Sequence, residues 1–226
     1  SHLVPHAAHQ PGEIVTFADA PAVIPQIPET LGFYWSEFRD PAGEAFADAF
    51  VNECGVSVVS NGCVASKVPE NAPNYGIGYG LRHLIAAREG VEIAAALIEE
   101  YGYYSARSYA ICDKDEGWIF QVTTGHNFVA QRVGDDEVQY IPNWYTIRGV
   151  DFSDEAHDRF YWSKNLVSYA IENGWYTPAA DDYSDFDFAL VYQDGAVEIP
   201  SNMLRSDLAW KQLTGAEPVP YRTFSI

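Results

Sequence analysis

Three cysteines, Cys54, Cys63 and Cys112, are the side chains with the chemistry for nucleophilic attack on a carbonyl carbon. A thiol becomes a good nucleophile when a nearby base, usually an imidazole, holds it as the thiolate. Cys54 falls in a predicted turn and Cys112 at the end of a predicted strand, so Cys63 is the best placed of the three. Because most single cysteines are buried structural thiols, we expect a structural role for each unless a histidine lies nearby in the fold.

The other patterns that carry chemistry are absent from the sequence. No two cysteines form a CxxC pair, the six histidines show no HExxH spacing, and no GxSxG nucleophile elbow is present. The run Gly76-Ile77-Gly78-Tyr79-Gly80 lacks the lysine and the preceding strand of a phosphate-binding loop. We interpret it as closely packed backbone at the start of a helix, and the sequence predicts neither a metal nor a cofactor.

Two strands joined by a tight turn are predicted for residues 47–60. The β-branched run of residues 56–60 suits a buried strand, and Gly55 permits a sharp turn before it. Asn61-Gly62 predicts a second turn or bulge directly after this strand.

Residues 77–101 carry a helical period in two blocks. Leu81, Leu84 and Ile85 lie on one stripe that ends at Gly90, and residues 91–98 form a second stripe that ends before Gly102. Two helices that pack against a core are the simplest interpretation.

The second half of the chain predicts an antiparallel meander followed by helices. Its strands are expected at residues 108–112, 118–122, 127–133 and 138–141, and its helices at residues 155–172 and around Leu204–Leu213. By contrast, the proline-rich residues 1–45 predict extended backbone with short strands at Val4 and at Ile14–Thr16. The order of elements indicates an α+β protein with helices layered on sheet.

Composition excludes several classes of partner. The formal net charge of −19 argues against binding to nucleic acid or to anionic lipid, and no apolar run approaches a membrane span. The acidic surface has two interpretations, simple solubility or attraction of cationic and amine-bearing substrates. With three cysteines and no basic-then-apolar start, the sequence predicts a cytoplasmic protein, although a signal peptide upstream of Ser1 remains open.

Several short segments, in this order and spacing, resemble the cysteine dipeptidases, a family of N-terminal-nucleophile hydrolases that includes the secernins. They are residues 52–56 (NECGV), 99–102 (EEYG), Asp113-Lys114 with Trp118, residues 129–133 (VAQRV) and Pro142-Asn143. The resemblance covers most of the chain from about His2 onward. It implies the four-layer αββα sandwich of that fold, which the pattern of elements alone would not select.

The resemblance also implies the chemistry. Members of this family attack a peptide carbonyl with the thiol of an N-terminal cysteine, whose own α-amine acts as the base. This chain begins with Ser1-His2-Leu3-Val4, which matches the segment after the first catalytic hairpin. We therefore expect the cysteine upstream of Ser1, a single domain over residues 1–226 that lacks this hairpin and the C-terminal part, and no peptidase activity from these residues alone. Ser1 itself is the alternative nucleophile.

Two asparagines are the candidates for oxyanion or substrate binding. By analogy with the related bile-salt hydrolases, Asn61 lies within one residue of one pocket asparagine, and Asn143 lies near the second. For both residues, a plain turn is the structural alternative, beside Gly62 in one case and after Pro142 in the other.

Three functions stay open from the sequence. The first is a dipeptidase acting on small peptides, and the second is an amidase of the same fold acting on a bile-salt conjugate or a penicillin. The third is a relative without catalytic activity that serves as a binding or structural module. A homo-oligomer, or association with a further fragment of the same protein, is compatible with each.

Overall fold

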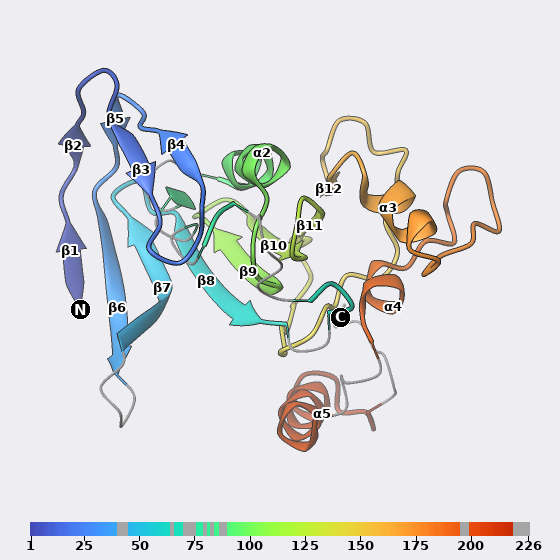
Figure 1. Cartoon of the computed structure of the whole chain (residues 1–226). Helices are drawn as coiled ribbons and strands as arrows, with labels where there is room; N and C mark the ends of the chain where they lie inside the picture. Colours follow the sequence, from blue (N-terminus) through green and yellow to red (C-terminus); the bar gives the residue numbers. More distant parts are fainter. Residues whose placement is uncertain are drawn as a thin grey trace.

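One antiparallel sheet of eight strands runs through the molecule (Figure 1). The computed structural model describes residues 1–39, 45–63, 66–69, 76–78, 81, 84–85, 90–194 and 199–218. In spatial order the strands are β1 (His2–Val4), β6 (Phe33–Arg39), β7 (Ala45–Asn52), β8 (Ser57–Gly62), β9 (Arg107–Cys112), β10 (Gly117–Val122), β11 (Phe128–Arg132) and β12 (Phe160–Trp162). Every pair of neighbours in this sheet is antiparallel.

Two short hairpin-like pairs and four helices complete the described elements. The pairs join β2 (Ala7–Ala8) to β5 (Glu29–Thr30) and β3 (Ile14–Thr16) to β4 (Val23–Pro25). The helices are α2 (Val91–Tyr101), α3 (Leu166–Glu172), α4 (Phe188–Tyr192) and α5 (Pro200–Thr214). With helices and an antiparallel sheet in separate stretches of chain, the α+β class expected from the sequence is confirmed.

Helix α2 covers one face of the sheet. Its buried side chains share a hydrophobic core with Phe50 and Val58 on the earlier strands and with Tyr109, Phe120 and Phe128 on the later ones. The buried residues of α2 are Ala94, Ala95, Leu97 and Ile98. Leu81, Leu84 and Ile85 lie in helical backbone and join the same core, as their spacing predicts.

Among the residues that the structure describes, the opposite face is covered over strands β9–β12. There Ile119 and Val129 pack against side chains of the segment that follows β11, among them Tyr145, Phe186 and Phe188. This segment contains α3 and α4, which lie beyond β12 toward one end of the molecule (Figure 1).

Over strands β1 and β6–β8, this second face is exposed and apolar. Leu3 is paired with Tyr34 and Tyr34 with Val51, and their exposed fractions are 77%, 47% and 43%. Val59, one strand further, is also 43% exposed. Alternate residues of a strand point to opposite faces, so the neighbouring Phe50 and Val58 belong to the first face. Both are buried, which shows that the cover over these strands lies on that face.

Most strands of the meander occur where the sequence predicts them. Strands β9, β10 and β11 match the ranges 108–112, 118–122 and 127–133 within two residues, and Gly55 makes the turn between β7 and β8 with a φ of 89°. Helix α2 confirms the second block of the 77–101 pattern. Tyr79, Gly80 and Arg88, which belong to the first block, lie outside the described residues.

Three local predictions are wrong. Asn61-Gly62 is not a turn, because both residues stay in β8 and pair with Ser108 and Arg107 of β9. Residues 138–141 form no strand, since the place beside β11 is taken by β12. The seven-residue β6 lies where only irregular extended backbone was expected.

The helix predicted for residues 155–172 is shorter than expected. Phe160–Trp162 is strand β12, and α3 begins only at Leu166. The carboxylate of Asp154 accepts hydrogen bonds from the backbone N–H groups of Arg159 and Phe160, at 2.8 Å and 2.7 Å. These bonds hold the chain in a loop that places Phe160 beside Gln131 at the edge of β11. Pairing of β12 with β11 therefore takes the place of the first turns of the expected helix.

Candidate active site

The two asparagines implied by the resemblance lie at one place, the end of β8. The side-chain nitrogen of Asn61 donates to the carbonyl oxygen of Ile141 at 2.6 Å. In the other direction, the side-chain nitrogen of Asn143 donates to the carbonyl oxygen of Gly62 at 2.9 Å. Both residues are partly exposed. An amide nitrogen carries two hydrogens and each of these bonds uses one, so each amide retains a donor for a substrate atom.

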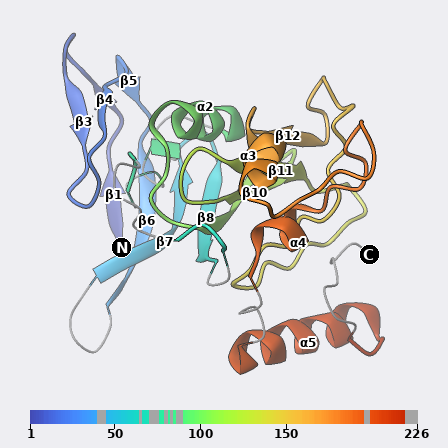
Figure 2. The same ribbon diagram turned by 45° about the vertical axis from the view of Figure 1, so that its right-hand side comes forward.

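Arg205 of α5 fixes the orientation of Asn143. One of its terminal nitrogens donates to the side-chain oxygen of Asn143 at 2.6 Å, and the same nitrogen contacts the side-chain oxygen of Asn202. Because the guanidinium occupies the oxygen of Asn143, the NH₂ group of that amide is directed toward β8. Helix α5, which lies along one edge of the molecule in Figure 2, is connected to the sheet through this contact.

A second arginine lies at the same strand end but on the other face of the sheet. Arg107 is partly buried and pairs with Gly62 in the sheet. A Cβ atom at Gly62 would lie 3.9 Å from a terminal nitrogen of Arg107. Because alternate residues of a strand point to opposite faces, Arg107 projects with Tyr109 from the face that α2 covers, and Asn61 projects from the other face. It is therefore the guanidinium of Arg205, in contact with Asn143, that makes the site suited to a carbonyl or carboxylate oxygen.

A buried polar chain supports the site from the neighbouring strands. Ser108 lies opposite Asn61, and its hydroxyl accepts a hydrogen bond from Gln121 of β10 at 3.0 Å. The carbonyl oxygen of Gln121 accepts from the backbone N–H groups of Thr146 and Ile147, both at 3.0 Å. These bonds fix the segment that begins at Asn143 against the sheet.

The three cysteines lie in different environments. Cys54 is exposed in the β7–β8 turn, and Cys63 is buried directly after β8. Burial raises the pKa of the Cys112 thiol, which favours the unreactive protonated form. His157 lines the same cavity as Cys112, but its Nδ1 atom is bound to the carbonyl of Phe160 at 2.9 Å, and no hydrogen bond joins it to the thiol.

The described residues were also compared with the requirements of a metal site and of a membrane-spanning helix. Within the described ranges, no group of three or more His, Cys, Asp and Glu residues is arranged to hold a metal ion. Among the helices described, none has both the length and the apolar character required to cross a bilayer.

Comparison with known proteins gives the family. The model of peptidase family C69 matches residues 76–212, which is more than half of the chain. The chain belongs to peptidase family C69. The resemblance to cysteine dipeptidases seen in the sequence is thereby confirmed.

Curated relatives of this C69 chain are dipeptidases by name. Dipeptidase A of Lactobacillus helveticus is 36% identical over 77 residues, which cover 34% of this chain and 16% of that protein. A dipeptidase of Bifidobacterium longum is 35% identical over 79 residues, covering 35% and 15%. The probable dipeptidase A of Streptococcus pyogenes serotype M1 is 29% identical over 145 residues, covering 60% and 29%. The matched parts thus span less than a third of these relatives.

Sequence reasoning identified Asn61 and Asn143 but missed Arg205, whose guanidinium binds Asn143. Arg205 lies in a stretch predicted only as an amphipathic helix. The sequence offers only a compositional signal, because only 13 of its charged residues are lysines or arginines. The proximity of Arg205 to Asn143 depends on a contact between residues that are far apart in the chain.

Proposed function

We propose that the protein of which these residues are part is a cysteine-type dipeptidase that hydrolyses small peptides. The observation that supports it most directly is the meeting of Asn61, Asn143 and Arg205 at the end of β8, in a chain of the C69 family. Amide N–H groups held by neighbouring hydrogen bonds are suited to stabilise the oxyanion of a tetrahedral intermediate.

In this proposal the nucleophile is the thiol of an N-terminal cysteine that lies ahead of Ser1. Its α-amine accepts the thiol proton, and the sulfur attacks the carbonyl carbon of the peptide bond. The C–N bond then breaks as the α-amine returns the proton to the leaving nitrogen, and water hydrolyses the thioester. Asn61 and Asn143 donate to the developing oxyanion, while Arg205 keeps the NH₂ group of Asn143 in position.

The proposal is tested on the full-length protein. We expect dipeptide hydrolysis that iodoacetamide abolishes, and a mature N-terminal residue that mass spectrometry identifies as cysteine. Asn61→Ala and Asn143→Ala should each lower kcat by about a hundredfold to a thousandfold, the usual cost of one oxyanion donor, with a smaller change in KM. Asn173→Ala is the matched control, because Asn173 is exposed at the end of α3 and its side chain donates to the carbonyl oxygen of Tyr169 in the same helix.

If Asn143→Ala is as active as the Asn173→Ala control, Asn143 is not a donor to the oxyanion. The substrate panel should include a bile-salt conjugate and a penicillin, since preferential cleavage of either would identify an amidase instead. The 226-residue chain alone should show no dipeptidase activity that a thiol reagent blocks. Such activity would place the nucleophile within these residues.

We further propose that the exposed face of β1 and β6–β8 is covered by a second sheet of the same protein. An apolar face of this kind, with Leu3, Tyr34, Val51 and Val59 in solvent, is costly unless another layer packs on it. A second sheet there would complete the four-layer αββα sandwich, with the end of β8 close to the space between the layers.

A further inference from the structure

A cavity of about 480 Å³ lies between the start of α2 and the β9–β10 turn, within the usual size range of small-molecule sites. Three carboxylates and three aromatic rings are among the side chains that line it. We call it the acidic cavity, and its defining residues are Glu92, Asp113, Glu116, Trp118, His157 and Tyr161.

The acidic cavity is separate from the candidate active site. Asn61 pairs with Ser108 near one end of β9, whereas Cys112, which lines the cavity, ends the strand at the other end. Four residue steps at about 3.3 Å each place the two sites on the order of 13 Å apart along β9. They also lie on opposite faces, because the cavity side chains Ile111 and Trp118 belong to the face that α2 covers.

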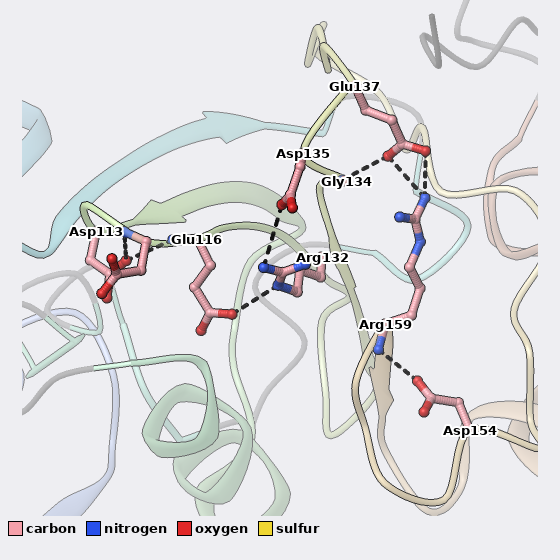
Figure 3. A network of polar contacts seen from close by, with 9 residues as sticks. Asp113, Glu116, Arg132, Gly134, Asp135, Glu137, Asp154 and Arg159 are labelled. Carbon is pink, nitrogen blue, oxygen red and sulfur yellow. Dashed lines mark hydrogen bonds and ion pairs between the residues drawn. The ribbon is translucent and has the colours of Figure 1, made fainter.

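The carboxylates give the acidic cavity a negative charge. Hydrogen bonds from the backbone N–H groups of Asp115 and Glu116, both 2.8 Å, lower the pKa of Asp113, so this group is ionised at neutral pH. Glu116 binds Arg132 at 2.9 Å, and the same guanidinium lies 3.7 Å from Asp135 (Figure 3). Since Arg132 is shared between Glu116 and Asp135, it neutralises only part of the negative charge of the acidic cavity.

No lysine or arginine is among the described residues that line the acidic cavity. The N–H groups at the start of α2 oppose a cation, but a helix end contributes only about half a unit charge. Glu92 lies in that first turn and counteracts it directly. The balance of charge therefore favours a positively charged ligand.

The aromatic rings are held in fixed positions around the cavity. The rings of His157 and Tyr161 meet edge to face, with centroids 4.3 Å apart and planes at 89°. Tyr161 also packs against Phe128, at a centroid distance of 5.8 Å. Because these contacts already fix the rings, an apolar body that packs against them costs little additional side-chain entropy.

We propose that the acidic cavity binds organic amines, a positively charged nitrogen attached to an aromatic or apolar body. The carboxylates of Glu92, Asp113 and Glu116 bind the ammonium group, and Trp118 and Tyr161 contact the apolar part. This site is independent of the proposed peptidase reaction, because it uses a different face and none of the residues assigned to catalysis.

The test compares three probes of similar shape, benzylamine, benzyl alcohol and benzoate, by isothermal titration calorimetry on the 226-residue chain. At neutral pH the ammonium form of benzylamine should bind at least about fivefold more tightly than the neutral alcohol, since one screened ion pair contributes about 1 kcal/mol. Benzoate should bind most weakly. Equal affinity for amine and alcohol, or tighter binding of benzoate, would overturn the proposal.

A pair of variants on one helix locates the binding. Glu92→Gln removes a carboxylate from the cavity and should weaken benzylamine binding about fivefold, the loss of one such ion pair. Glu100→Gln removes the same charge from the exposed far end of α2 and should leave the affinity unchanged. If both variants weaken binding equally, the effect comes from overall charge, and the cavity is not the site.

Discussion

At the scale of single residues, Gln121 connects the sheet to the segment that carries Asn143. Its side chain is fully buried and takes part in four hydrogen bonds, two with backbone N–H groups and two with the hydroxyls of Ser108 and Thr146. A buried glutamine is uncommon, and here each of its polar atoms has a partner.

Gln121→Leu should destabilise the protein strongly. The change leaves the N–H groups of Thr146 and Ile147 buried without acceptors, and each such group costs about 1 to 3 kcal/mol. We expect the free energy of unfolding to fall by about 2 to 5 kcal/mol in urea denaturation followed by circular dichroism. Gln131→Leu on the adjacent strand β11 is the control, and it should change the stability by less than about 1 kcal/mol because Gln131 is only partly buried. Equal losses would show that the hydrogen bonds of Gln121 contribute nothing specific.

The structural settings of Asn61 and Asn143 depend on contacts with distant segments. In the sequence, a turn was an equal interpretation of each. The structure rejects a turn at Asn61, which is paired within β8, and gives both amides hydrogen bonds that join distant segments. The catalytic assignment itself stays a prediction, to be tested by the kinetics of the two alanine variants.

At the scale of elements, the β7–β8 turn depends on Gly55. Its φ of 89° lies in the left-handed region, and nothing lies within 4 Å of the position that a Cβ would take. The need for glycine is therefore one of backbone conformation and not of space. This turn sets the pairing that brings Asn61 to its place at the end of β8.

Gly55→Ala should cost about 1 to 2 kcal/mol, the penalty for an L-residue in the left-handed region. Gly149→Ala is the matched control, because that glycine also has an open Cβ position but no positive φ. Thermal and urea denaturation of the two variants give the comparison. The backbone argument fails if both substitutions have the same effect.

Helix α5 shows how an element can be predicted while its orientation is not. The sequence indicates a helix around Leu204–Leu213, and α5 spans Pro200–Thr214. Its buried residues are the polar Asn202 and Ser206, while Leu204 and Leu208 are 60% and 59% exposed. The contacts of Asn202 and Arg205 near Asn143 direct the polar side inward and leave the leucine side in solvent.

At the scale of the whole molecule, the two faces of the sheet differ. One packs on α2, and the described residues cover the other over β9–β12 and leave it in solvent over the earlier strands. The covered half lies under α3, α4 and their loops, and the uncovered half bears Leu3, Tyr34, Val51 and Val59. The relatives in the family are several times longer than the parts that match this chain. The second sheet proposed above would account for the apolar character of the uncovered half.

Val59→Lys distinguishes a covered face from an exposed one. In the 226-residue chain, Val59 is 43% exposed and a lysine there can reach water, so stability should change by less than about 1 kcal/mol. In the full-length protein the same charge would be buried under the second sheet, and we expect a loss of more than about 3 kcal/mol. Ile171→Lys on α3, at a site 39% exposed, should have a small effect in both proteins. Equal effects of Val59→Lys in the two proteins would contradict the layered arrangement.

The sequence by itself determined the elements whose patterns are local. Alternating and β-branched residues specified β8 to β11, a helical period specified α2 and α5, and Gly55 specified its turn, because each pattern depends on neighbours within a few residues. The short segments that resemble the cysteine dipeptidases indicated the peptidase family for the same reason, because each is a run of neighbouring residues.

Only the tertiary structure decided which elements meet. Residues 138–141 and 160–162 both have strand-like composition, but it is residues 160–162 that pair with β11, as strand β12. The meeting of Asn61 with residue 141, and of Asn143 with Arg205, likewise joins segments that are 80 and 62 residues apart. Such contacts depend on the closure of long loops and on the packing of whole faces, which no local pattern encodes.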